Sequence, residues 1–276
     1  MSRLEIKGLN HAYALKNVLQ DIRLTLDAGR LLALVGPSGC GKTTLLHLCA
    51  GLLAPQHGAI ENTFVRPAVM FQQPRLLPWK TVRDNIALGL RAAGVGSTEC
   101  RWRAQETACA VGLDDLALGQ FPHTLSGGMQ SRAALARALV LEPDLLLMDE
   151  PFSALDIGLK GQMHRLLLEQ QARRGVAVLM ITHDLMEAVR LADTVLVMAP
   201  GPGRIVHCFQ PPIPAHARSE TDVYHITAKL LQIPTVRSSF ALPPDIAGSS
   251  AILPDKDAHP GVLLPAAPAL PEKKVA

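Results

Sequence analysis

The stretch Gly36-Pro-Ser-Gly-Cys-Gly-Lys-Thr-Thr44 decides the fold of this chain. It follows the apolar run Leu31–Val35 and leads into an apolar, helix-forming segment that starts near Lys42. Strand, Gly-x-x-x-x-Gly-Lys-Thr and helix, in that order, form the phosphate-binding loop pattern in its required setting. Its glycines let successive backbone N–H groups face an anion, and the helix N-terminus adds its positive dipole end. We therefore predict a site for nucleotide phosphates here rather than an ordinary glycine-rich turn.

Individual side chains of this loop have separate expected roles. Lys42 would place a compact positive charge on the β- and γ-phosphates, and the Thr43 hydroxyl would ligate Mg²⁺. Cys40 lies inside the loop, where it is either a structural filler or a thiol whose alkylation would block the nucleotide. The predicted nucleotide-binding residues of the loop are Gly36, Pro37, Ser38, Gly39, Cys40, Gly41, Lys42, Thr43 and Thr44.

Further polar residues follow apolar, strand-like runs elsewhere in the chain. Residues 145–149 end in Asp149 and precede Glu150, residues 69–71 lead to Gln72, and residues 176–181 lead to Thr182 and His183. Carboxylates at the ends of parallel strands suit Mg²⁺ coordination and water activation, although a helix cap after the strand is the structural alternative. Gln72 could orient water and ligate Mg²⁺ or be a simple turn residue. His183 could hydrogen-bond a γ-phosphate.

Two other features are ambiguous when only their residues are considered. Leu125-Ser-Gly-Gly-Met-Gln130 opens a helix over residues 131–141, with Ser126 as a plausible N-cap. Its two glycines indicate a close approach by a ligand or backbone, so a helix cap and a phosphate contact are equally favoured. Tyr13, ahead of the loop, could stack on a nucleotide base, but spacing alone favours a filler role.

Composition narrows the class of protein. With 276 residues, 48% of them hydrophobic, the chain can bury a substantial core. A formal net charge of +3 with 18% charged residues does not indicate a nucleic-acid partner. Five dispersed cysteines without a metal-ligand spacing indicate reduced thiols in a cytosolic protein. The N-terminus lacks a signal-peptide layout and no apolar stretch is long enough to span a bilayer, so a membrane role would be indirect.

The alternation of strands and helices predicts a parallel sheet flanked by helices, an α/β fold. Helical spacing covers residues 81–93, 98–111 and 219–232. Eight prolines then gather in residues 233–276, which we predict to be a disordered tail. Leu76, Leu77 and Trp79 form an apolar group in an expected loop, either tucked under the domain or offered to a partner.

Taken together, the motifs and their order resemble the ATP-binding-cassette (ABC) family over roughly residues 3–210. Residues 36–44 look like its Walker A loop, and residues 145–149 look like Walker B with Glu150 as the following catalytic glutamate. Gln72 matches the Q-loop, residues 125–130 the signature sequence, residues 153–156 the D-loop, His183 the switch histidine and Tyr13 the base-stacking aromatic. Residues 72–79 and 202–205 are similar to ATPase subunits of nitrate, sulfonate and taurine importers, while Ser131 departs from the commoner residues after the signature.

The resemblance implies a P-loop NTPase fold with a parallel core sheet, an antiparallel β subdomain and an inserted helical subdomain at about residues 74–143. The ATP-binding domain would span residues 1–232. The implied activity is ATP hydrolysis that powers import of a small anion, with ATP and Mg²⁺ bound, Glu150 as general base and His183 bracing the γ-phosphate. Gln72 would act beside them. The implied metal ligands are Thr43, Gln72 and Asp149.

The resemblance also implies partners. Two chains would join head to tail, so that each ATP also meets Ser126, Gly127 and Gly128 of the other chain. Transmembrane permease subunits would receive the energy at the cytoplasmic face of the inner membrane, and a periplasmic or extracellular solute-binding protein would act indirectly. An ABC exporter, a soluble ABC ATPase and a regulatory module without turnover are the rivals. Glu150 and His183 argue against the last of these, and the absence of coiled coils or a second cassette argues against the soluble ATPase.

Overall fold

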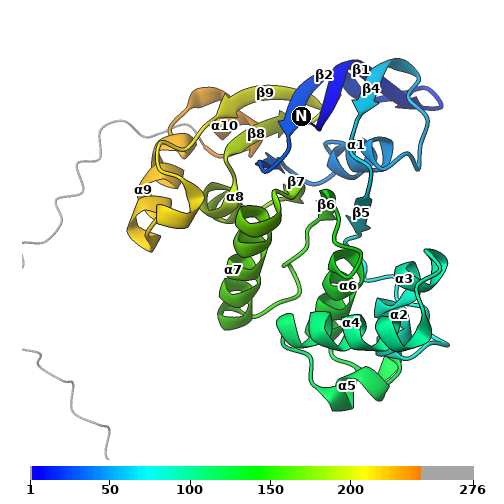
Figure 1. The fold of residues 1–276 in the computed structure, drawn as a ribbon. Coiled ribbons are helices and arrows are strands. Elements are labelled where there is room, and N and C mark those ends of the chain that lie inside the picture. Colours follow the sequence, from blue (N-terminus) through cyan, green and yellow to red (C-terminus); the bar gives the residue numbers. More distant parts are fainter. Residues whose placement is uncertain (1, 244–276) are drawn as a thin grey trace, which may run out of the picture. The chain divides into compact units, whose positions relative to one another are not determined.

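Two β-sheets and the helices around them make up residues 2–243, the part of the chain that this computed structural model describes (Figure 1). A three-stranded antiparallel sheet has the order β2-β1-β4. Its strands are β1 (Arg3–Tyr13), β2 (Lys16–Asp27) and β4 (His57–Asn62). This sheet is the antiparallel β subdomain of the fold that the resemblance implies.

The second sheet has six strands in the order β5-β6-β7-β3-β8-β9. Five of them run parallel, as the sequence predicts, whereas β9 runs antiparallel to β8. Only residues 200–203 join β8 to β9, too short a connection for the crossover that a parallel strand requires. The strands are β3 (Leu31–Val35), β5 (Pro67–Met70), β6 (Leu145–Asp149), β7 (Ala177–Thr182), β8 (Thr194–Ala199) and β9 (Arg204–Phe209).

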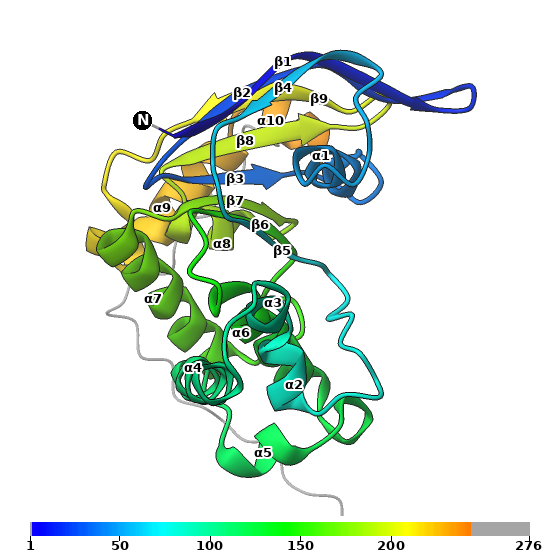
Figure 2. The same cartoon turned by 45° about the vertical axis from the view of Figure 1, so that its right-hand side comes forward.

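Both faces of the six-stranded sheet are covered, which explains why its strands read as continuous apolar runs. In β3, Leu31, Ala33 and Val35 face one core, while Leu32 and Leu34 face the other. The first core lies against α6 (Gly127–Leu139), α7 (Ile157–Arg174), α8 (Leu185–Leu191) and α9 (Glu220–Leu231). The second core joins the antiparallel sheet to α1 (Lys42–Cys49), which Figure 2 shows beside the two sheets.

A group of helices is inserted between β5 and β6. It consists of α2 (Val82–Ile86), α3 (Leu88–Ala92), α4 (Ser97–Ala110), α5 (Asp115–Gly119) and α6. The helix predicted over residues 81–93 is interrupted at Ala87, although bonds from Ala87 N–H to Arg83 O and from Arg91 N–H to Ala87 O continue across it. These helices fall within the span of about 74–143 that the resemblance implies. No helix within residues 2–243 is both long and apolar enough to cross a membrane.

The folded unit extends past residue 232, where the sequence places the start of a disordered tail. Residues Pro234–Ser239 form α10, whose Val236 is fully buried, and ordered structure continues to residue 243. The prediction is therefore wrong for residues 234–239, because Pro234 occupies the first helical turn rather than breaking a helix. Residues 244–276, the rest of the predicted tail, lie outside the described residues.

Truncation after Ile233 is expected to destabilise the fold relative to truncation after Pro243. The shorter chain loses Val236 and Phe240, which pack on the core, and burial of one such side chain stabilises by about 1.5–3 kcal/mol. We expect the chain ending at Ile233 to unfold at a lower temperature than the chain ending at Pro243 in a calorimetric comparison. Identical unfolding temperatures would contradict a structural role for α10.

Candidate functional site

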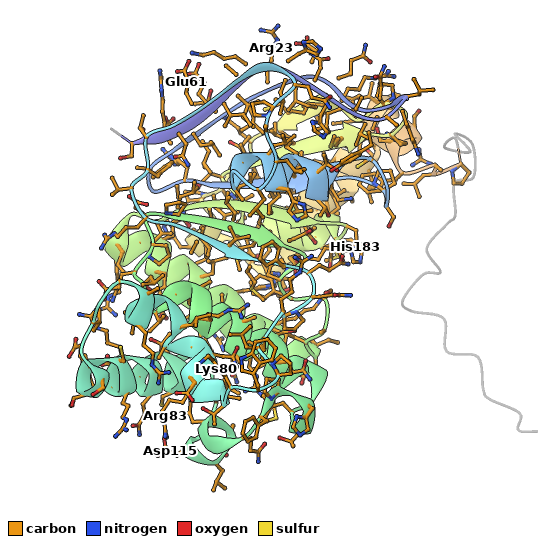
Figure 3. All side chains as sticks on the ribbon, turned by 90° about the vertical axis from the view of Figure 1, so that its right-hand side faces the viewer. Arg23, Glu61, Lys80, Arg83, Asp115 and His183 are labelled. Atoms are coloured by element: carbon orange, nitrogen blue, oxygen red, sulfur yellow. The ribbon has the colours of Figure 1, made fainter. Side chains whose placement is uncertain are left out.

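The predicted site residues that follow strands β3, β5, β6 and β7 meet at one edge of the six-stranded sheet. Parallel pairing sets Met70 beside Met148, Asp149 beside Ile181 and Val35 beside Thr182, so the strands end together. The segments that follow these strand ends carry Gln72, Glu150, His183 and the loop 36–44. Figure 3 labels His183, which lies at the outer margin of the molecule between the sheets and the inserted helices.

The loop 36–44 has the backbone that a phosphate cradle needs. Gly39 and Gly41 have φ angles of 78° and 99°, a region that residues other than glycine rarely adopt. A Cβ atom on Gly41 would also lie 2.8 Å from Leu19 Cδ2 in β2. The backbone of this turn therefore favours glycine at both positions, and at Gly41 the neighbouring side chain leaves no space for a Cβ atom.

Lys42 is folded back onto this loop. Its side chain is only 6% exposed, and Nζ donates hydrogen bonds to Gly36 O (2.7 Å) and Pro37 O (2.9 Å). The ammonium thus sits within the turn, where it can meet phosphate oxygens. Cys40 Sγ lies 3.8 Å from Lys42 Nζ, and burial raises the pKa of this thiol, as befits the structural filler rather than a reactive group.

Asp149 and Thr43 present two oxygen atoms side by side. Thr43 Oγ1 donates a 2.8 Å hydrogen bond to Asp149 Oδ2, and the Asp149 side chain is almost fully buried. Burial raises the pKa of Asp149, the Thr43 hydrogen bond opposes this shift, and the neighbouring Glu150 charge adds to it. Carboxylate and hydroxyl oxygens are suitable ligands for Mg²⁺. Within residues 2–243 no three His, Cys, Asp or Glu residues cluster as a metal site.

Glu150 is held by both of its carboxylate oxygens. Gln72 Nε2 donates to Oε2 at 3.1 Å, and His183 Nδ1 lies 3.2 Å from Oε1. The backbone of Glu150 has a φ of 46° and its N–H donates to Ile181 O at 2.9 Å. A non-glycine residue in this strained region is held by its surroundings and is typical of functional sites. A hollow of about 80 Å³ beside Glu150 and His183 has room for water.

A buried polar group behind His183 was not predicted. Thr182 Oγ1 donates to Glu187 Oε2 at 2.7 Å, and His164 Nε2 lies 3.4 Å from Glu187 Oε1. The His164 ring meets the edge of Phe152 at a centroid distance of 4.8 Å, two residues after Glu150. This group links the segment after Glu150 to the strand end before His183. Glu187 lies in the first turn of α8 and His164 lies in α7. Neither residue is part of a sequence motif, so their contact could not be predicted from the sequence.

Tyr13 lies at the end of β1, half exposed, with its ring edge-on to His11 at 5.0 Å. His11 pairs with Leu19, whose side chain approaches Gly41 of the loop. His11 is buried, and both of its ring nitrogens are without a hydrogen-bond partner among the described residues. Tyr13 thus lies on the hairpin that borders the loop, and its contact with a base stays a prediction.

Ser126 is the N-cap of α6, as predicted, and its Oγ accepts a hydrogen bond from Met129 N–H at 3.3 Å. The helix begins at Gly127, earlier than the predicted residue 131. Within residues 2–243 no hydrogen bond joins residues 126–128 to the loop 36–44. Figure 2 shows α5, which precedes this segment, at the end of the helical group remote from α1. Within one chain, Gly128 instead lies beside Ala154 and Leu155.

Comparisons with known proteins match large parts of the chain. The family model described as "ABC transporter" matches residues 19–153. The aliphatic sulfonates import ATP-binding protein SsuB of Corynebacterium glutamicum is 44% identical over 227 residues, which are 82% of this chain and 92% of that protein. The taurine import ATP-binding protein TauB of Escherichia coli O157:H7 is 45% identical over 210 residues, 74% of this chain and 82% of that protein.

Solved structures agree with these relatives. The dimeric, post-hydrolysis structure of the ATP-binding cassette MJ0796 bound to ADP and Pi superimposes with a TM-score of 0.70 at 26% identity. The match covers 75% of this chain and 98% of that one. A further dimeric structure of the same cassette, described as a bacterial ABC transporter cassette, gives the same TM-score and coverage.

Proposed function

The chain belongs to the ABC transporter family as one of its ATPases, and we propose that it powers the import of a small anion such as a sulfonate, taurine or nitrate. One observation carries the proposal: Glu150, held between Gln72 and His183, lies next to the Thr43–Asp149 pair and the phosphate loop. The similarity to SsuB and TauB supports an importer over the exporter and soluble alternatives. Sulfonate and taurine come from the names of these two relatives, and nitrate comes from the resemblance of residues 72–79 and 202–205.

Hydrolysis would use the residues already gathered at the sheet edge. Lys42 and the loop N–H groups bind the phosphates, and Glu150 accepts the proton of the attacking water. His183 and Gln72 hold the Glu150 carboxylate in position, and His183 borders the hollow in which that water would sit. Mg²⁺, held by Thr43, Asp149 and Gln72, would supply positive charge to the β- and γ-phosphates.

The proposal includes an assembly. Two copies of the chain would bind head to tail, so that Ser126, Gly127 and Gly128 of one copy meet the γ-phosphate in the other. The dimeric form of the related cassette MJ0796 supports this arrangement. Each copy would dock on a transmembrane permease subunit at the cytoplasmic face of the cell membrane, and a solute-binding protein would deliver the anion from outside.

Trp79 offers a direct test of the docking surface. Of the apolar group singled out in the sequence, Leu76 packs against the core and Leu77 is half-buried, whereas Trp79 is 71% exposed. Trp79→Ser is expected to weaken co-purification with the permease and to lower ATP-dependent uptake of the sulfonate, taurine or nitrate substrate in membrane vesicles. ATP binding should be unchanged, because the ring lies outside the core.

Trp102→Ser is the matched control, since this tryptophan is 57% exposed on α4 and is not part of the predicted docking loop. It should leave co-purification and uptake intact. Equal losses in both variants would contradict a specific docking role for Trp79. Uptake of none of these solutes by the intact complex would overturn the proposed solute class while leaving the ATPase assignment in place.

A further inference from the structure

Arg137, near the C-terminal end of α6, holds the loop that carries Gln72. Its Nη1 donates to Arg75 O at 2.8 Å and its Nη2 donates to Pro74 O at 2.7 Å. One guanidinium thus binds two successive carbonyls more than sixty residues away in the chain. A planar fork of donors can make such a pair, whereas a lysine ammonium cannot reproduce its fixed geometry.

The loop between β5 and α2 is held from two other sides as well. The Arg75 guanidinium lies 4.5 Å above the centre of the Phe71 ring, and Phe71 meets the edge of His47, on α1, at 5.9 Å. Gln72 donates to Glu150. Arg75 has a φ of 45°, a strained value that persists only where surrounding contacts determine it. The position of Gln72 therefore depends on the contacts of its neighbours Phe71, Pro74 and Arg75.

We infer that Arg137 is a positioning residue that couples α6 to Gln72 and, through Gln72, to Glu150. The inference rests on the proposed function. Gly127 and Arg137 belong to the same helix and are ten residues apart, which at a rise of about 1.5 Å per residue separates them by about 15 Å along its axis. A shift of α6 therefore displaces the carbonyls of residues 74 and 75. When Ser126 contacts the nucleotide of a neighbouring copy, the resulting shift of α6 therefore changes the positions of Gln72 and of Glu150, the general base, in the same chain.

Arg132 provides the matched control on the same helix. It is also half-buried, and its Nη1 donates to a single carbonyl, that of Gly112, inside the inserted helical group. Its loss removes an arginine-to-carbonyl contact from α6 without touching the Gln72 loop. A general weakening of α6 would affect both variants, whereas loss of the proposed coupling affects only Arg137.

The experiment compares Arg137→Gln, Arg137→Lys and Arg132→Gln with the wild type in steady-state ATP hydrolysis. We expect Arg137→Gln to lower kcat by about tenfold or more while the KM for ATP changes less than about threefold, because the phosphate loop is untouched. Arg137→Lys keeps the charge and one hydrogen bond, so its kcat should lie between that of the wild type and that of Arg137→Gln. Arg132→Gln should stay within about twofold of the wild type.

Hydrogen exchange of the backbone amides in residues 72–79 gives a second readout that needs no turnover. Exchange should be faster in both Arg137 variants and unchanged in Arg132→Gln. If Arg137→Gln fails to fold, the same two measurements on Arg137→Lys decide.

Three outcomes would overturn the inference. The first is an unchanged kcat in a folded Arg137 variant, and the second is a raised KM for ATP without a lower kcat. The third is an equal loss of kcat in Arg132→Gln. A wild-type protein without turnover would contradict the proposed function instead, and the exchange result would still decide whether Arg137 holds the loop.

Discussion

Lys42→Ala is expected to lose ATP turnover while the protein stays folded. Nζ of Lys42 is the one side-chain cation that hydrogen-bonds within the loop 36–44 in the described residues, where it meets Gly36 O and Pro37 O. Removing a single preorganised donor from a developing negative charge costs about 10²–10³-fold in rate. Here the lost donor is a full charge in a buried position, so we expect at least that loss in a phosphate-release assay, together with weaker ATP binding.

Lys229→Ala is the control for the change in net charge. Lys229 is exposed on α9 and is not part of the site, so this variant should keep wild-type turnover. Thermal unfolding followed by circular dichroism checks that Lys42→Ala remains folded. Turnover within a few fold of the wild type in folded Lys42→Ala would refute the assignment of this loop as the nucleotide site.

The sequence predicted those parts of the site that follow uninterrupted apolar strands. The loop after β3, Asp149 as the last residue of β6 and His183 after β7 each lie at a strand end, and parallel pairing brings strand ends to one edge. Their proximity therefore follows from chain order and local pattern. The contacts of Glu150 with Gln72 and His183 agree with that expectation.

Features that depend on long-range packing were missed. Arg137 binds backbone carbonyls, which carry no residue-type signature, and the partner of His164 lies on another helix. Helix α10 is short, and its fully buried Val236 is too isolated to give a periodic signal. The antiparallel direction of β9 depends on the length of one connection rather than on the composition of the strand. The sequence pattern thus identified the candidate site residues, whereas the contacts that hold them in place became visible only in the tertiary structure.

Among the described residues of one chain, no hydrogen bond joins Ser126 or Gly128 to the phosphate loop. Their proposed role therefore requires a second chain. If the ATP site is formed by residues of two chains, bound ATP should hold the two chains together as long as it is not hydrolysed. Glu150→Gln removes the proposed general base while keeping the size of the side chain and one of its acceptor oxygens, so ATP should bind and persist. Size-exclusion chromatography of this variant is expected to show a dimer with ATP and a monomer without it.

Adding Gly128→Asp to Glu150→Gln should return the protein to a monomer with ATP still bound. A Cβ atom at Gly128 would lie 3.5 Å from Ala154 O and 3.6 Å from Leu155 Cδ2, which are ordinary contacts, so the backbone has space for a Cβ atom there. A carboxylate in the first turn of α6 also interacts favourably with the helix dipole in the monomer. Any loss of the dimer would therefore come from repulsion between this carboxylate and the partner's γ-phosphate, not from unfolding.

Gly128→Asn in the same Glu150→Gln background separates charge from size. Asparagine adds the same volume without the negative charge, so it should weaken the ATP-dependent dimer less than aspartate does. Raised salt should partly restore the dimer of the aspartate variant, since screening reduces the repulsion. Equal dimerisation of the aspartate, asparagine and parent proteins would mean that Gly128 does not face a phosphate across the interface. The coupling of α6 to ATP would then need a different contact, because the helix N-terminus would have no anion to meet.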